Sequence, residues 1–324
     1  MFSVGIQVKK CETRSLKSFK DLHFEDSCMS LEKKTGAVVH DGPFHADEII
    51  ACVQLLYANL IQKNEIHRSR DPLVLSKFQF VVDVGAVYDE KHFLFDHHQS
   101  SYQGELSSAG MVAKFLFHQG FYDLPLYQHL KKELIDHVDA FDNGRVSREI
   151  LNTPTFSHVI ENFVPIREAA DKEEMNRAFF QALDFAYGHF DRLVERYRYR
   201  QRCKEVVKKV MESCEEILVF DEMVPWLENF FELGGENHKA KYIVMPVPNG
   251  WKLRVIPKTY ADRMGARLDL PSFWGGLNEE EFESISGIKG GKFCHKGLFI
   301  AIFATKEGAI EGAKRSLKHH KKET

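Results

Sequence analysis

Three short apolar stretches of this chain each lead into histidine or aspartate. They are Ala37-Val38-Val39, Phe80-Val81-Val82 and Phe93-Leu94-Phe95. The polar side chains that follow them are His40, His45, Asp47, Asp83, Asp96, His97 and His98. Imidazole mixed with carboxylate suits Mn²⁺ or a similar ion better than the all-oxygen shell that Mg²⁺ prefers. The spacing therefore predicts a metal centre, with Mn²⁺ as the expected ion.

Two divalent ions about 3.5–4 Å apart are a common arrangement for phosphodiester hydrolysis, in which one ion generates hydroxide and both hold the phosphate. Such a site needs one bridging carboxylate with further histidines and aspartates around it. A later carboxylate, Asp139 or Asp142, would complete the set. Asp142 directly precedes Asn143-Gly144, where an Asx turn would explain it equally well. The residues alone leave the choice between these two aspartates open.

The elements that would position these side chains alternate between strands and helices. From the apolar periodicity, strands are expected at 36–40, just before Arg68, at 78–84 and at 93–95. Helices are expected at 46–60, 107–119 and 124–141. Glu48 falls in the first turn of the helix at 46–60, where the helix dipole favours an acid. This alternation predicts βαβ units and a parallel sheet. Open sheets of this kind bind ligands beyond the carboxyl ends of their strands, which is where the polar residues fall.

The second half of the chain has a different pattern. A long charged helix is expected over 171–214, followed by strands at 216–220, 242–246, 253–256 and 292–303 and a helix at 306–317. Residues 318–322 are expected to form a solvated tail. The arginines between 192 and 202 indicate either a solvated helix face or one wall of a nucleic-acid groove.

A chain of 324 residues is long for one core, and we expect an α/β protein of two domains. The expected parts are an N-terminal extension over 1–34, a metal-binding catalytic domain over 35–165, a helical connector over 166–215 and a smaller substrate-binding α/β domain over 216–324. The smaller domain is expected to close over the metal cleft.

Composition limits the partners and the compartment. The formal net charge of −3 gives no global basic field, so long duplex nucleic acid is not an expected partner. No run approaches the ~20 apolar residues of a membrane span. The six cysteines show no CxxC pair, which favours reduced thiols and a cytoplasmic protein. A mitochondrial location and the oligomeric state, a homodimer included, stay open.

The ordered set of motifs resembles the DHH phosphoesterase superfamily and, within it, the melanocyte-proliferating-gene family of metal-dependent exonucleases. The matching phrases are HDGPFHADE at 40–48, RDP at 70–72, VDVG at 82–85, SSAG at 107–110, VDAFDNG at 138–144 and SGI at 286–288. The resemblance covers nearly all of the chain after residue 35. One departure is His45, which stands where the wider superfamily has Asp and matches the exonuclease branch.

The resemblance implies roles for individual residues. Asp83 would bridge two ions, His40 and His45 would hold one of them, and Asp47, His97 and the late aspartate would hold the other. His98 would face the phosphate, and Asp96 would be a weak ligand or would orient an imidazole. The substrate-binding candidates are Arg70, Lys258, Arg263, Arg267 and His295. The glycine-rich turn of relatives is replaced here by Ala301-Ile302-Phe303.

Together these features predict a metal-dependent phosphodiester hydrolase with Asp83 and His98 as catalytic residues. The expected activity is a 3′–5′ exonuclease acting on short single-stranded RNA or DNA or on dinucleotides. Two alternatives stay open: a small-molecule phosphoesterase such as a pyrophosphatase, and a regulatory module whose ions only stabilise the fold.

Overall fold

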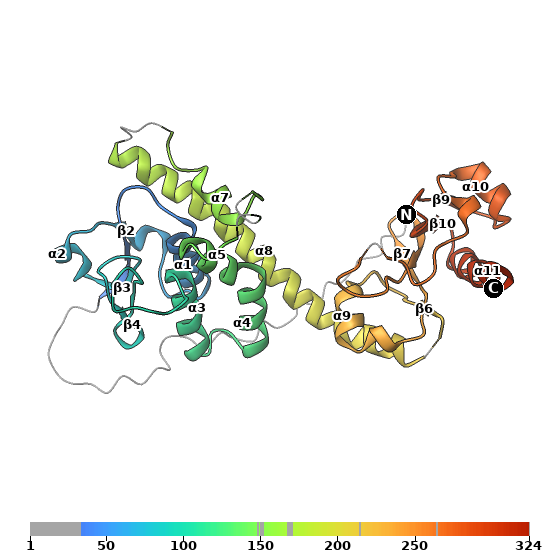
Figure 1. Ribbon diagram of the computed structural model, residues 1–324, viewed down its shortest axis with the longest axis horizontal. Coiled ribbons are helices and arrows are strands. Elements are labelled where there is room, and N and C mark those ends of the chain that lie inside the picture. The colour runs from blue at the N-terminus through green and yellow to red at the C-terminus, as the bar shows by residue number, and fades with distance from the viewer. Residues whose placement is uncertain are drawn as a thin grey trace, which may run out of the picture. The chain divides into compact units, whose positions relative to one another are not determined.

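The computed structural model describes residues 34–323 except 148, 150, 151, 167–170, 214 and 264. The chain divides into two compact units between Glu195 and Arg196. This division falls within the longest helix, α8 (Lys172–Glu212), which is drawn in yellow-green in Figure 1. The expected N-terminal extension lies, except for Lys34, outside the described residues, and the expected domain borders at 35, 165 and 215 stay predictions.

The N-terminal unit is built on a five-stranded sheet. Its strands are β1 (Thr35–Val39), β2 (Ile66–Arg68), β3 (Phe78–Val82), β4 (Tyr88–Asp89) and β5 (Leu94–Phe95). In the order β2-β1-β3-β5-β4, all neighbours are parallel except β4, which runs antiparallel to β5. The predicted parallel sheet is confirmed, and its central strands end at one edge.

The helices of this unit are α1 (Ala46–Tyr57), α2 (Pro72–Leu75), α3 (Ser108–His118), α4 (Leu124–Leu130), α5 (Asp136–Asp142) and α7 (Phe156–Glu161), with short 3₁₀ turns η2 (Lys63–Glu65) and η3 (Glu90–His92). Helix α1 connects β1 to β2, α2 connects β2 to β3, and the others follow β5. The helices expected over 46–60, 107–119 and 124–141 are confirmed, whereas α2 and α7 were not predicted. Helices α1 and α3 pack against each other. The single helix expected over 124–141 contains a π-helical turn, η4 (Lys131–Ile135), between α4 and α5. Helix α5 ends at Asn143-Gly144, the stop that the sequence predicts.

The C-terminal unit is built on a second five-stranded sheet. Its strands are β6 (Ile217–Val219), β7 (Tyr242–Val247), β8 (Gly250–Val255), β9 (Gly291–Cys294) and β10 (Ile300–Phe303), in the order β6-β7-β8-β10-β9. Only β6 and β7 are parallel to each other. The α/β class holds for both units, with a mainly parallel sheet in the first and a mainly antiparallel sheet in the second.

Two predictions in this unit were wrong. The single strand expected over 292–303 is the hairpin of β9 and β10, because residues 295–299 form a turn closed by the backbone bond from His295 N–H to the Ile300 carbonyl. Ala301-Ile302-Phe303 is consequently strand β10 and not a turn. The expected tail over 318–322 continues helix α11 (Lys306–Glu323), which begins where we expected it. The remaining helical elements are α9 (Leu227–Glu232), η5 (Gly235–Asn237), η6 (Ser272–Trp274) and α10 (Glu279–Ser286).

Arg267 joins several loops of the C-terminal unit. Its Nε donates to the carbonyl of Pro257 at 3.0 Å, and its Nη2 donates to the carbonyl of Gly235 at 2.7 Å. Its Nη1 donates to the carbonyls of His238 and Ala240 at 2.6 and 3.1 Å. Because the donors of this guanidinium bind backbone carbonyls, Arg267 holds the loops in place. The resemblance implies a different role, in which Arg267 contacts the substrate. Substrate binding by Arg267 stays a prediction.

Replacing this side chain separates the two roles. Arg267→Ala leaves several carbonyls without donors, and each loss of a buried partner costs about 1–3 kcal/mol. We expect the free energy of unfolding to fall by roughly 2–4 kcal/mol in urea denaturation followed by circular dichroism. If Arg267→Ala is as stable as wild type but binds substrate more weakly, Arg267 contacts the substrate instead.

Candidate metal centre

The carboxyl ends of β1, β3 and β5 bring most of the predicted residues together. His40 follows β1, Asp83 follows β3, and Asp96 follows β5, while Asp47 lies in the first turn of α1. These four side chains are buried. Asp83 has a φ of 55°, in the left-handed region that few non-glycine residues occupy. Such strain is held mostly where surrounding structure fixes a functional geometry.

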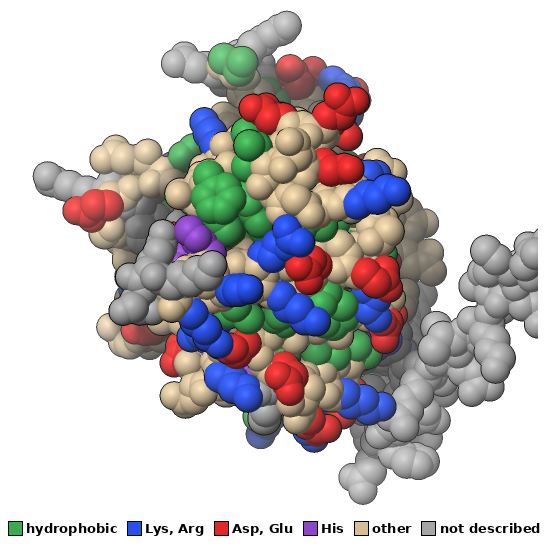
Figure 2. All heavy atoms as spheres, turned by 90° about the vertical axis from the view of Figure 1, so that its right-hand side faces the viewer, with side chains coloured by type: hydrophobic (Ala, Val, Ile, Leu, Met, Phe, Trp, Pro, Cys, Tyr) green, Lys and Arg blue, Asp and Glu red, His purple; other side chains and the backbone are tan. Residues whose placement is uncertain are grey.

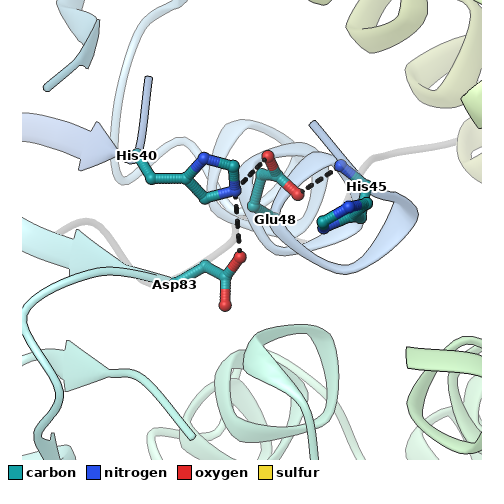
Figure 3. Close-up of side chains that lie close together, drawn as sticks. All are labelled: His40, His45, Glu48 and Asp83. Atoms are coloured by element: carbon teal, nitrogen blue, oxygen red, sulfur yellow. Dashed lines mark hydrogen bonds and ion pairs between the residues drawn. The ribbon is translucent and has the colours of Figure 1, made fainter. Parts of the chain in front are cut away.

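His40 lies between two carboxylates, as Figure 3 shows. Its Nε2 is 3.0 Å from Oε1 of Glu48 and 3.4 Å from Oδ2 of Asp83. Its Nδ1 is 3.0 Å from the carbonyl oxygen of Asp41, which fixes the ring orientation. One potential ligand atom from each of His40, His45, Glu48 and Asp83 lies within 4.8 Å of the others. His45 is the exposed member of this group.

His97 faces a second group of carboxylates. Its Nε2 is 3.1 Å from Oδ2 of Asp142, 3.4 Å from Oδ1 of Asp83 and 3.9 Å from Oδ2 of Asp47. The two oxygens of Asp83 therefore face different histidines, Oδ2 toward His40 and Oδ1 toward His97. A carboxylate shared in this way has the geometry of a bridging ligand.

Asp139 and Asp142 have different surroundings although both lie on α5. Oδ1 of Asp139 accepts hydrogen bonds from the N–H and the hydroxyl of Ser107, at 3.0 and 2.6 Å, and from the N–H of Gly110 at 3.0 Å. Burial raises the pKa of Asp139 to about 6. A Cβ atom on Gly110 would lie 2.2 Å from Oδ2 of Asp139. Asp139 thus holds the start of α3, while Asp142 faces His97.

Both carboxylate oxygens of Asp96 are engaged by other residues of the chain. Its Oδ1 lies 2.8 Å from Nδ1 of His98 and accepts from the His98 N–H at 3.0 Å, and its Oδ2 accepts from the N–H of Ala86. This arrangement suits the orienting role better than a ligand role. The His98 side chain is 60% exposed, so it lies at the mouth of the site.

The histidines and carboxylates of this centre shift one another's pKa values. Burial alone would lower the pKa of His40 and of His97, but the carboxylates beside each ring raise both to about 10. Burial opposes the shift at Asp83, yet the two histidines hold the pKa of this carboxyl well below its usual range. Burial and the charge of Asp83 raise the pKa of Asp47.

The donor set fits divalent metal ions. In the ranges that the structure describes, several buried side-chain atoms around this centre make no hydrogen bond of suitable geometry: Oδ1 of Asp47, Oε1 of Glu48, Oδ1 of Asp83, Nε2 of His97 and Oδ2 of Asp139. Those of Glu48, Asp83 and His97 have ion-pair contacts only. Buried polar atoms are normally paired, and a bound ion is one explanation for those that are not. Mixed imidazole and carboxylate donors suit a transition ion such as Mn²⁺.

Glu48 is the residue that sequence reasoning missed. Its place in the first turn of α1 is explained by the helix dipole alone, which gives no reason to expect it at the metal centre. The structure shows it fully buried, with Oε2 accepting from the N–H of His45 at 2.8 Å and Oε1 facing His40. It lies three residues after the cap, which is the spacing of a capping box, but His45 stands where that motif has Ser or Thr, so the sequence signal was weak.

Of the substrate-binding candidates, Arg70 belongs to the N-terminal unit and the others to the C-terminal unit. Arg70 is exposed, with Nε 3.7 Å from Asp41. Lys258 is exposed, and Arg263 lies over the ring of Tyr260, 4.5 Å from its centroid. Nδ1 of His295 accepts from the N–H of Gly297 at 2.9 Å. Their substrate roles stay predictions.

Paired substitutions on α5 distinguish the two aspartates. Asp139→Ala leaves the donors of Ser107 and Gly110 unpaired, so we expect about 2–4 kcal/mol less stability in chelator but a retained gain in melting temperature with Mn²⁺. Asp142→Ala is expected to change stability in chelator little and to reduce the Mn²⁺-dependent gain. Thermal melts with and without Mn²⁺ measure both. The reverse pattern would make Asp139 the ligand.

Comparison with known proteins identifies the family of this chain. The model of the MYG1_exonuc family, described as "Uncharacterised protein family (UPF0160)", matches residues 37–317. The chain is 40% identical over 294 residues to the MYG1 protein of Chlamydia trachomatis, covering 90% of this chain and 99% of that protein. It is 30% identical over 337 residues to the human MYG1 exonuclease, covering 86% and 84%.

A solved structure of RecJ in complex with Mn²⁺ from Thermus thermophilus aligns over 89% of this chain and 52% of its own length. At 13% identity and a TM-score of 0.27, that alignment supports no conclusion. The family match and the two relatives are sufficient without it: the chain belongs to the MYG1 exonuclease family.

Proposed function

We propose that this protein is a metal-dependent phosphodiester hydrolase that acts as an exonuclease on short single-stranded nucleic acid or on dinucleotides. The observation that carries the proposal is Asp83, whose two carboxylate oxygens face two separate histidine-carboxylate groups. The name of the human relative, MYG1 exonuclease, supports the same class of reaction. The proposed direction of digestion is 3′ to 5′.

The residues that would hold the ions follow from the two groups. His40, His45 and Glu48 would hold one ion, with Asp83 shared between the two. Asp47, His97 and Asp142 would hold the other, from the contacts of His97 with both carboxylates. Ligand atoms of His45 also lie within 4.8 Å of Asp47 and Asp142, and those of His98 within 4.8 Å of Asp83 and His97. When bound, such ions activate water and neutralise charge on the phosphate. We propose Mn²⁺ as the ion because each group contains histidine.

His98 is the residue of this chain that we propose contacts the phosphate. Its Nδ1 is engaged by Asp96, which leaves Nε2 of the ring to donate toward a substrate oxygen. The hydrogen bond with Asp96 raises the pKa of His98, so the ring favours its charged, donating form. Donors placed at developing negative charge stabilise the transition state.

A substrate panel tests the reaction class. The purified chain is assayed with Mn²⁺, Mg²⁺ or chelator against pyrophosphate, a cyclic dinucleotide, a short RNA and the matching DNA. We expect hydrolysis of phosphodiesters in Mn²⁺, less in Mg²⁺ and none in chelator. A 5′-labelled strand should shorten stepwise if digestion is 3′ to 5′. Activity on pyrophosphate alone would replace the nuclease by a small-molecule phosphoesterase.

Asp83→Asn distinguishes an enzyme from a protein whose ions only stabilise the fold. Without metal, neighbouring carboxylates repel Asp83, but its ion pairs with His40 and His97 hold its pKa below the usual range, so neutralising it should lower stability in chelator moderately while the protein stays folded. Wild type should gain about 2.7 kcal/mol at a hundredfold excess of Mn²⁺ over its dissociation constant. The variant should gain much less and have no turnover. A variant that is unfolded in chelator would show that Asp83 mainly supports the fold.

His98→Ala tests the phosphate contact. The expected loss in kcat is roughly 10²–10³, by analogy with removal of one oxyanion donor, while Mn²⁺ binding measured by calorimetry stays at its wild-type stoichiometry. Glutamine at the same position, which keeps a donor, should recover part of the rate. Loss of one bound ion in the alanine variant would instead assign His98 to the metal.

A further inference from the structure

The sheet of the C-terminal unit has two unlike faces. On one face, Val244, Leu253 and Ala301 form a cross-strand row of buried apolar side chains. This row belongs to the core cluster that includes Ala309 and Ala313 of α11. Because side chains alternate along a strand, the next residues of β7, β8 and β10 point to the opposite face.

Only part of that opposite face is covered. Residues of α8 between 203 and 211, together with Trp226 and Phe230, bury Ile243 and Met245 of β7. No described residue of β8, β9 or β10 belongs to that cluster. The strands outside that cluster present two cross-strand rows, Lys252 with Ile302 and Phe293, and Arg254 with Ile300. These five side chains are all partly exposed, and we call them the open face.

The two basic side chains of the open face lack acidic partners. Among the residues that the structure describes, no carboxylate lies within 4 Å of the charged nitrogens of Lys252 or Arg254. Partial burial lowers the pKa of both groups, and for Lys252 the charge of Arg254 adds to the effect. Glu228 lines the same 330 Å³ hollow as these residues, but it already accepts from Arg200 and Tyr260. Two neighbouring cations without a counter-charge favour an anionic ligand.

Aromatic rings extend from these cations along one edge. The guanidinium of Arg254 lies 5.9 Å from the centroid of the Phe299 ring, which packs against the core cluster of the other face and lies 4.4 Å from the ring of His295. Phe293 continues the series, 6.2 Å from His295. Partly exposed aromatic rings beside cations are the combination by which proteins bind single-stranded nucleic acid, with bases on the rings and phosphates at the cations.

We infer that the open face binds the phosphate backbone of single-stranded nucleic acid through Lys252 and Arg254, with bases stacking on Phe293. This inference rests on the proposed nuclease function and names the surface that holds the strand. Charge alone would also attract an acidic peptide, but the row of rings favours bases. The attraction is local, because the chain has a formal net charge of −3 and no global basic field. Basic and acidic side chains are likewise intermixed on the side of the molecule shown in Figure 2.

Binding in chelator tests the surface without hydrolysis. Fluorescence anisotropy measures the affinity of the full chain for labelled oligo-U and oligo-dT of roughly ten nucleotides across a salt series. We expect Lys252→Gln/Arg254→Gln to weaken binding about tenfold or more at low salt. The slope of log affinity against log salt should become shallower by about 0.7 for each phosphate that the variant no longer neutralises. Phe293→Ala should weaken binding roughly five- to tenfold and leave the salt slope unchanged.

The matched control is Lys289→Gln/Lys314→Gln, which removes two exposed charges from the same unit, one of them on α11 across the sheet. It should bind like wild type, and thermal melts with Mn²⁺ should show that every variant is folded. Three outcomes would overturn the inference. They are a wild-type salt slope in the Lys252/Arg254 variant, no binding of either oligonucleotide by the wild type, and tighter binding of poly-glutamate than of the oligonucleotides. If the strand binds here but is never cleaved in Mn²⁺, the inference stands and the proposed function fails.

Discussion

Electrostatic balance around Asp83 determines how the N-terminal unit is arranged. Asp47, Glu48, Asp83 and Asp139 are buried within a short distance of the strand ends, and Asp142 is only slightly exposed. Potential ligand oxygens of Asp47 and Asp142 lie within 4.8 Å of each other. Two like charges at that distance cost on the order of 3 kcal/mol at an effective dielectric constant of about 20. Positive charge from His40 and His97, or from metal ions, offsets this repulsion.

A layer of hydrogen bonds around the centre fixes the ligand geometry. Glu48 uses one oxygen to cap α1 at His45, and Asp139 uses one oxygen to hold Ser107 and Gly110 at the start of α3. Asp96 fixes the ring of His98. The helices that cover the sheet are thereby attached to the same carboxylate cluster that would hold the ions. A substitution that removes one of these hydrogen bonds would therefore shift the metal-binding side chains even though those side chains are unchanged.

Sequence pattern predicted the strand ends well because each apolar run passes directly into its polar residues, as at Val39-His40 and Val82-Asp83. It could not separate Asp139 from Asp142. These residues are three apart on a helix, so both lie on one face, and helical periodicity does not distinguish them. The π-helical turn before α5 adds to the difficulty because it shifts the phase of every later side chain. Only their partners, Ser107 and Gly110 for one and His97 for the other, tell them apart.

The C-terminal unit was harder to predict because its sheet is mainly antiparallel and one strand pair is joined by a short turn. Residues 292–303 look like one continuous strand until Lys296-Gly297 is recognised as a turn between β9 and β10. That turn has a functional consequence. It places Phe293 and Ile302 side by side on the same face as Lys252, whereas a single long strand would have separated Phe293 from Ile302 by about 30 Å. The open face therefore exists only because the chain folds back at this hairpin, and the composition of the strands alone does not indicate it.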